Sequence, residues 1–291
     1  MRLAQAFLLL RMLVMNRNEE LLNKVTATNS ESLTLIINCL REYGICILPN
    51  YISDEVCDLV RGDCVSRAEV DEDMDFEDGS YRRYDGPKTT KPLQDKRVYH
   101  TDCFNEDMLK FKNDDFLKMI CKRYYGDKSD YSVHVQMYDR QQYNDFPIRG
   151  LHIDSFQTST FKAMLYLDDV GENDGPTSYI IKTHRDNELR RLKKDVWGPG
   201  YEFEGTKHKE THPTNFSRLE LGEDRLNNWV KVIAKKGSLI LFDTWGVHCG
   251  TDVGVDGDRH IVVNYYKEGK NLKRSNFGYD SVQDLKNSGN V

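Results

Sequence analysis

The segment Lys236-Gly-Ser-Leu-Ile-Leu-Phe-Asp-Thr244 decides the fold class. Its Lys-Gly pair predicts a turn, and the apolar run that follows predicts a short buried strand. Similar runs rich in Val, Ile, Leu and aromatic residues occur at Tyr131–Tyr138, Phe161–Leu167, Ser178–Lys182 and His260–Tyr266. Turn residues over 171–176 and 254–258 separate some of these runs, and most have no helical pattern between them. Several short strands in this order predict an antiparallel sandwich or barrel, in a mainly β fold.

Helical patterns precede these strands. Apolar residues at helical spacing predict a helix over residues 30–43, and a short strand over Ile45–Leu48 follows it. Ser53 is a suitable N-cap for a second helix, and a third is predicted over residues 105–125. Residues 69–90 are rich in acidic residues and lack periodicity, so they are predicted to form a loop.

The chain length suits one large domain or two small ones. We expect a single domain over 1–291, with a helical part at 1–130, a β core at 131–266 and a polar tail at 267–291. A highly charged insertion over 185–232 interrupts the core, and either a solvated surface segment or a lid over the active site explains it.

Composition excludes several classes of function. The net charge of −6 argues against general binding to nucleic acid, and no GxGxxG or P-loop supports a nucleotide fold. The seven cysteines form no CxxC pair, which predicts reduced thiols and a cytoplasmic location. The apolar run Met1–Met15 is too short to cross a bilayer, so no stable membrane insertion is expected. No feature of the sequence specifies an oligomeric state.

Four residues carry the chemistry. His152 and Asp154 are two apart, so on a strand their side chains point to the same face. His248 follows the strand at 238–243, where a third ligand can converge on them. Two histidines and one carboxylate are the ligand set of a mononuclear iron(II) site with open positions. Arg259 opens the next apolar strand, and a buried guanidinium requires an anion such as a carboxylate.

With these motifs the chain resembles the iron(II)- and 2-oxoglutarate-dependent dioxygenases of the phytanoyl-CoA dioxygenase-like family. The matching segments are Leu151-His-Ile-Asp154, Lys162-Ala-Met-Leu-Tyr-Leu-Asp-Asp169, Asn173-Asp-Gly-Pro176 and Lys236–Thr244, followed by His248 and Arg259. The resemblance implies a double-stranded β-helix (jelly-roll, cupin-like) core with helices packed outside it.

The resemblance also implies a role for each site residue. His152, Asp154 and His248 would bind Fe(II), and Arg259 would pair with the distal carboxylate of the co-substrate 2-oxoglutarate. Further candidate contacts to the co-substrate are Gln136, Tyr138, Thr251 and Lys162. Core packing or contact with substrate explains Gln136 and Tyr138 equally well. Related halogenases have a small residue in place of the carboxylate, so Asp154 favours hydroxylation over halogenation.

The predicted reaction hydroxylates an unactivated C–H bond of a small molecule, consumes O2 and releases succinate and carbon dioxide. Desaturation or ring closure would begin in the same way. A basic stretch that includes Arg82, Arg83, Lys88 and Lys91 would receive an anionic substrate, or it is simply a solvated loop. Two alternatives use the same ligands: a non-oxidative zinc enzyme, which would not require Arg259, and a cupin-like binding module.

Overall fold

Two antiparallel sheets form the centre of the molecule. The structure, a computed structural model, describes residues 16–27, 32–69, 74–85, 95–126, 131–141, 150–154, 160–194, 216–254 and 257–268. The large sheet has the strand order β1-β9-β6-β11-β5-β4-β3-β2, and the small sheet has the order β10-β7-β8. Every pairing between these strands is antiparallel. The predicted jelly-roll core, mainly β with helices packed around it, is confirmed.

The bounds of the elements are as follows. The large sheet contains β1 (Ile45–Leu48), β2 (Met74–Asp75), β3 (Tyr81–Asp85), β4 (Asp95–Tyr99), β5 (Tyr131–Gln141), β6 (Thr160–Tyr166), β9 (Leu239–Asp243) and β11 (Arg259–Glu268). The small sheet contains β7 (Thr177–Ile180), β8 (Trp229–Lys231) and β10 (His248–Gly250). The helices are α2 (Leu33–Tyr43), α3 (Asp54–Ala68), α4 (Glu106–Lys112), α5 (Asp115–Tyr125), α6 (Asn187–Lys194) and α7 (Arg218–Leu226), and a further helix covers residues 16–25.

Alternation along the strands separates two cores, one on each face of the large sheet. On β6, Phe161, Ala163 and Leu165 pack under α2, α3, α4 and α5 in the outer core. Met164 and Tyr166 point the other way and pack in an inner core, against Tyr179 and Val230 of the small sheet. A period of two along a strand produces this division. The inner core therefore lies between the two sheets.

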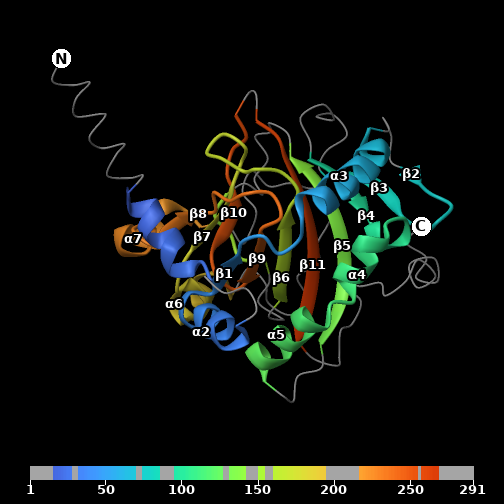
Figure 1. Cartoon of the computed structure of the whole chain (residues 1–291). Coiled ribbons are helices and arrows are strands. Elements are labelled where there is room, and N and C mark those ends of the chain that lie inside the picture. Colours follow the sequence, from blue (N-terminus) through green and yellow to red (C-terminus); the bar gives the residue numbers. More distant parts are fainter. Residues whose placement is uncertain are drawn as a thin grey trace.

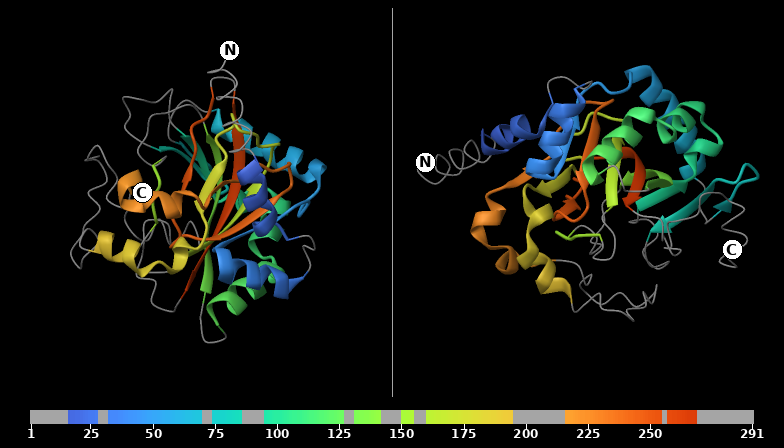
Figure 2. Two further views of the ribbon diagram at one scale, coloured as in Figure 1. Left: turned by 90° about the vertical axis from the view of Figure 1, so that its left-hand side faces the viewer. Right: turned by 90° about the horizontal axis from the view of Figure 1, so that it is seen from below.

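A third core covers the outer face of the small sheet. Residues from α6 and α7 pack there against Leu151, Ile153, Val247 and Cys249. Figure 1 shows α3 and α4 at the right of the molecule, α5 at the bottom, and α6 and α7 at the left. In Figure 2, α6 (yellow) and α7 (orange) lie beside each other at the small sheet. Helices thus cover both sheets from outside, and the inner core stays between them.

Local signals explain where the helices begin and end. Ser53 accepts a hydrogen bond from the backbone N–H of Val56 at 3.4 Å, as expected for the N-cap of α3. Helix α2 ends at Gly44, which has a φ of +84°. A Cβ at Gly44 would lie 2.4 Å from the hydroxyl of Tyr179, so this turn also brings α2 close to the inner core.

Two sequence predictions were wrong in detail. The helix predicted over 105–125 is two helices, because Asp114 accepts hydrogen bonds from the N–H groups of Phe116 and Leu117 and begins α5 anew. The segment predicted as a loop over 69–90 contains β2 and β3, which extend the large sheet beyond β4. Residues 70–73 and 86–90 lie outside the described residues.

Parts of the charged range 185–232 pack against the small sheet. Helices α6 and α7 supply Leu189 and Leu221 to the third core, and β8 is an edge strand of the small sheet. Residues 195–215 lie outside the described residues, so the lid stays a prediction. All seven cysteines are free thiols. Among the described helices, none combines the length and apolar character needed to cross a bilayer.

Candidate metal centre

His152, Asp154 and His248 come together at the inner side of the small sheet. Each offers one ligand atom, and these atoms all lie within 4.8 Å of one another. The Nε2 atoms of His152 and His248 lie 3.5 and 3.2 Å from Oδ1 of Asp154. The two imidazole rings have centroids 4.6 Å apart. Elsewhere in the described ranges no other group of His, Cys, Asp and Glu side chains has this spacing.

Backbone pairing places the two histidines side by side. The N–H of His152 donates to the carbonyl of His248 at 2.9 Å, and the N–H of His248 donates to the carbonyl of His152 at 2.8 Å. Residues that exchange both hydrogen bonds lie directly opposite each other with side chains on the same face. Leu151, Ile153, Val247 and Cys249 pack on the outer face. The alternation therefore directs both imidazoles inward.

Each imidazole is held in one tautomer. Nδ1 of His152 lies 2.8 Å from the carbonyl oxygen of Gly150, and Nδ1 of His248 lies 2.9 Å from that of Gly246. A carbonyl oxygen only accepts, so in the neutral ring Nδ1 carries the proton and Nε2 presents its lone pair. Two lone pairs and a carboxylate oxygen thus converge on one point, an arrangement that a bound cation stabilises. The donor set fits a divalent transition metal such as iron.

The electrostatics of the site favour the ligating form of both Asp154 and His248. Burial opposes ionisation of Asp154, but the Lys162 ammonium and His248 outweigh it and hold the pKa of that carboxyl well below its usual range. Burial lowers the pKa of His248 to about 4. Near neutral pH, Asp154 is therefore an anion and His248 is a neutral ligand. Metal binding need not displace a proton from either group.

Arg259 lies in the inner core at the start of β11. Its side chain is 1 % exposed, and Nη1 donates to the hydroxyl of Thr177 at 2.8 Å. Thr177 lies on β7 two residues from Tyr179, whose Cα is paired with that of His248. The guanidinium is therefore anchored to β7, the strand that pairs with β10 and so with His248.

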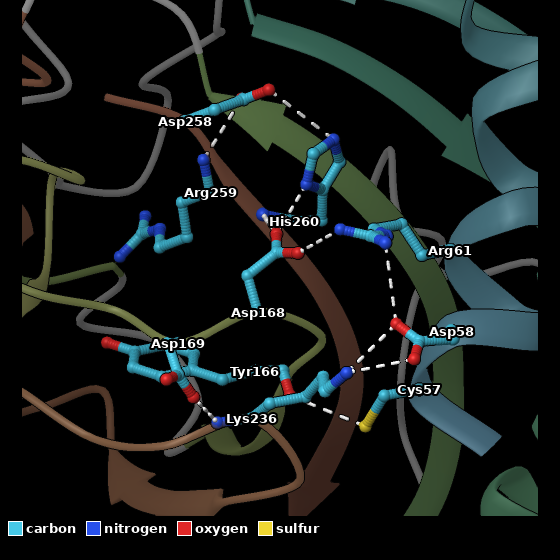
Figure 3. A network of polar contacts seen from close by, with 10 residues as sticks. All are labelled: Cys57, Asp58, Arg61, Tyr166, Asp168, Asp169, Lys236, Asp258, Arg259 and His260. Atoms are coloured by element: carbon cyan, nitrogen blue, oxygen red, sulfur yellow. Dashed lines mark hydrogen bonds and ion pairs between the residues drawn. The ribbon is translucent and has the colours of Figure 1, made fainter. Parts of the chain in front are cut away.

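A polar network holds the start of β11 in place (Figure 3). The carboxylate of Asp168 accepts hydrogen bonds from the backbone N–H of His260 at 3.0 Å and from its imidazole. The other carboxylate oxygen accepts from Arg61 of α3 at 2.7 Å. In Figure 3 the side chains of Arg259 and His260 point in opposite directions from β11. Fixing His260 on the outside therefore also fixes Arg259 on the inside.

The remaining predicted co-substrate contacts are placed as follows. Gln136 and Tyr138 lie on β5, with Cα partners Asn264 and Val262 on β11. Val262 is in the outer core, and the side-chain amide of Asn264 donates to the carbonyl of Phe111 in α4. The side chains of Gln136 and Tyr138 lie outside the described part of the structure, so their contacts stay predictions.

Thr251 and Lys162 occupy different places relative to the site: Thr251 lies near Arg259, and Lys162 contacts Asp154. The hydroxyl of Thr251 donates to the carbonyl of Pro176 at 2.8 Å, next to the threonine that binds Arg259. A direct contact of Thr251 with the co-substrate stays a prediction. Lys162 lies in the site itself, with Nζ 2.7 Å from Oδ2 of Asp154. A signal for Lys162 is present in the sequence. Alternation along β6 places this charged residue on the same inner face as the apolar residues Met164 and Tyr166.

At least one residue of the predicted basic stretch is not exposed, although binding of an anionic substrate would require exposure. Arg82 is fully buried and pairs in register with Val98, a residue of the outer core. It therefore lies on the face of the large sheet that the helices cover. The side chain of Arg83, together with Lys88 and Lys91, lies outside the described residues. An anionic substrate stays a prediction.

Facing antiparallel sheets with this donor set at their inner side define a metal-site protein of the double-stranded β-helix class. The family model "Phytanoyl-CoA dioxygenase (PhyH)" matches residues 40–261, a range that contains all three metal-site residues and Arg259. The chain belongs to this family, as its resemblance predicted.

Solved structures show the same fold at low sequence identity. The epimerase SnoN, solved with Fe3+, alpha ketoglutarate and nogalamycin RO, is 11 % identical with a TM-score of 0.54, covering 82 % of this chain and 84 % of that one. The non-heme alpha ketoglutarate dependent carbocyclase SnoK is 16 % identical with a TM-score of 0.54, covering 82 % of this chain and 86 % of that one. A search of curated proteins found no match.

Proposed function

We propose that the protein is an iron(II)- and 2-oxoglutarate-dependent oxygenase that hydroxylates an unactivated C–H bond of a small molecule. The observation that carries the proposal is the convergence of the His152 and His248 Nε2 atoms on Oδ1 of Asp154. Family membership and the buried Arg259 support it. When bound, iron(II) and 2-oxoglutarate supply the oxidising chemistry, with release of succinate and carbon dioxide.

The residues of the chain would bind and orient the metal and the co-substrate, and they would exclude water from the site. His152, Asp154 and His248 would hold the metal, a ligand set that leaves positions for a co-substrate. Arg259 would bind the distal carboxylate of 2-oxoglutarate, because a guanidinium pairs well with a carboxylate. Tyr166 contributes an aromatic wall, since the Arg259 guanidinium carbon lies 5.9 Å from its ring centroid.

The inner core limits access of water to the reacting centre. Tyr179 and Phe242 are fully or almost fully buried, and their rings lie 6.4 and 5.2 Å from that of His248. A dry wall on this side strengthens the interaction between a charged co-substrate and its cationic partner. It also leaves substrate to approach from the side opposite these rings.

The reaction outcome is the part of the proposal that needs product analysis. SnoN is an epimerase and SnoK a carbocyclase, so this fold hosts more than one outcome. Hydroxylation inserts one oxygen atom into the substrate, whereas epimerisation leaves its composition unchanged. Mass spectrometry of the product would distinguish the two. Hydroxylation adds the mass of one oxygen atom to the substrate, and this atom carries the label when the reaction is run under ¹⁸O2.

Anaerobic titration with iron(II) and then 2-oxoglutarate tests the proposal directly. A weak visible charge-transfer band should develop in the wild-type protein and be absent in Asp154→Ala. Asp169→Ala removes an exposed carboxylate that pairs with Lys235, so it serves as the matched control and should retain the band. A folded, iron-loaded wild-type protein without the band would favour the zinc or binding-module alternatives.

A further inference from the structure

The two carboxylate oxygens of Asp154 have different partners. Oδ1 lies 3.2 Å from Nε2 of His248 and 3.5 Å from Nε2 of His152. Oδ2 lies 2.7 Å from Nζ of Lys162. One oxygen therefore faces the histidines, and an ammonium group holds the other.

The ammonium group of Lys162 lies in a mostly buried, aromatic environment, where it needs an anionic partner. It is on β6, paired with Phe242 on one side and Tyr265 on the other. Its Nζ lies 5.7 Å from the ring centroid of Phe242 and 5.2 Å from that of Tyr265. The side chain is 13 % exposed, and Asp154 is its acidic partner among the described residues. Aromatic faces stabilise an ammonium group in part, but the carboxylate is the partner that neutralises it.

We propose that Lys162 is a positioning residue that restricts Asp154 to one coordinating oxygen and so keeps a metal position open for the keto acid. The inference rests on the proposed function. A carboxylate with both oxygens free binds a metal through either one or two of them. Two-oxygen binding by Asp154 would occupy a position that a chelating 2-oxoglutarate requires. The contact between Lys162 and Oδ2 opposes that mode.

Charge leads to the same role for Lys162. Iron(II) with one carboxylate and two neutral imidazoles has an excess positive charge, to which the ammonium adds. The 2-oxoglutarate dianion brings two negative charges to the site, and the ammonium attracts them together with the metal and the Arg259 guanidinium. Lys162 therefore disfavours the metal alone and favours the metal together with the keto acid. Removing its charge should affect the two ligands in opposite directions.

The test separates binding of the metal from binding of the keto acid. Lys162→Met and Lys162→Gln remove the charge, Lys162→Arg retains it, and Lys235→Met is a matched control at an exposed lysine. Each variant is titrated anaerobically with Mn(II) alone, and then with 2-oxoglutarate at saturating Mn(II), by calorimetry. Both neutral variants should bind Mn(II) at least as tightly as wild type and bind 2-oxoglutarate about 10-fold to 100-fold more weakly. Lys162→Arg should recover part of the loss, and Lys235→Met should match wild type.

Three results would overturn the inference, and each has a distinct appearance. Unchanged 2-oxoglutarate affinity in either neutral variant would show that Lys162 does not prepare the site. A parallel fall in Mn(II) affinity, 2-oxoglutarate affinity and melting temperature would show a packing role only. Metal-loaded wild type that binds no 2-oxoglutarate would instead remove the proposed function itself, before any variant is compared. Two neutral side chains are used so that a folding defect in one leaves the comparison intact.

Discussion

Replacing the neighbouring residues Asp168 and Asp169 by alanine should lower the free energy of unfolding by very different amounts. Asp168 accepts hydrogen bonds from the backbone N–H and imidazole of His260 and from Arg61. His260 is only 8 % exposed, so its two donors would lose their acceptor in a nearly dry position. Each unsatisfied donor of this kind costs about 1–3 kcal/mol. Arg61 is 41 % exposed and adds little. We expect Asp168→Ala to lower the free energy of unfolding by about 3 kcal/mol.

Asp169 makes contacts of the same chemical type at the surface. Its carboxylate accepts from Lys235 at 2.6 Å and from the backbone N–H of Lys236 at 3.0 Å. The side chains of Asp169 and Lys235 are 61 % and 81 % exposed, so water replaces the lost partners. Exposed ion pairs contribute about 0–1 kcal/mol, and Asp169→Ala should cost no more than that.

Urea denaturation of the two variants measures the difference, and keto-acid affinity shows its effect on the site. Asp168 holds the outside of β11 where Arg259 begins the strand, so the metal-loaded Asp168→Ala protein should bind 2-oxoglutarate about tenfold more weakly, equivalent to about 1.4 kcal/mol. Asp169→Ala should bind it as wild type does. Equal losses of stability in both variants would refute the reasoning that burial of the His260 donors sets the cost.

Three further outcomes are expected. Arg259→Met should abolish 2-oxoglutarate binding while the protein still binds Mn(II), as calorimetry would show; retained keto-acid binding contradicts the role of the guanidinium. Gly246→Ala should destabilise the fold by several kcal/mol, because its Cβ would lie 1.8 Å from the hydroxyl of Tyr179, whereas Gly62→Ala in α3 meets no atom within 4 Å and should stabilise it by about 1 kcal/mol; thermal melts rank the two. Burial lowers the pKa of His248 from 6.5 to about 4, so as the pH falls the unfolded chain takes up this proton first. The free energy of unfolding of the metal-free protein should therefore fall by about 3 kcal/mol between pH 6.5 and about 4, and His248→Gln should show a smaller fall in urea titrations.

Several of the strands and the convergence of His152, Asp154 and His248 were predictable from sequence because their signals are local or chemically rare. The run Leu239–Asp243 is apolar enough to indicate a buried strand, and β9 occupies it. His152 and Asp154 are only two residues apart and converge as predicted, although their segment forms a single bridge at His152 and not the predicted strand. His248 completes a donor set with few other uses. In each case a short segment contains the whole signal.

Features that depend on contacts between distant segments were not predictable. Strands β2 and β3 belong to the large sheet through pairing with β4 and β5, and their charged sequence gives no apolar alternation. The break at Asp114 was hidden because apolar spacing continues across it, and only the capping hydrogen bonds show where α5 begins. The pairing of Lys162 with Asp154 needs the register of β6 against β9 and β11.

The reciprocal backbone bonds between His152 and His248 have a thermodynamic consequence. Both imidazoles become neighbours only when residues 150–154 dock against β10, so an ion bound by both is bound by the docked chain alone. Such an ion stabilises the docked form by about 2.7 kcal/mol when its free concentration is 100 times its dissociation constant. Iron supply would then affect the lifetime of the protein as well as its catalytic rate. Without the ion, residues 150–154 would separate from β10 more often and would be cleaved there by proteases more readily.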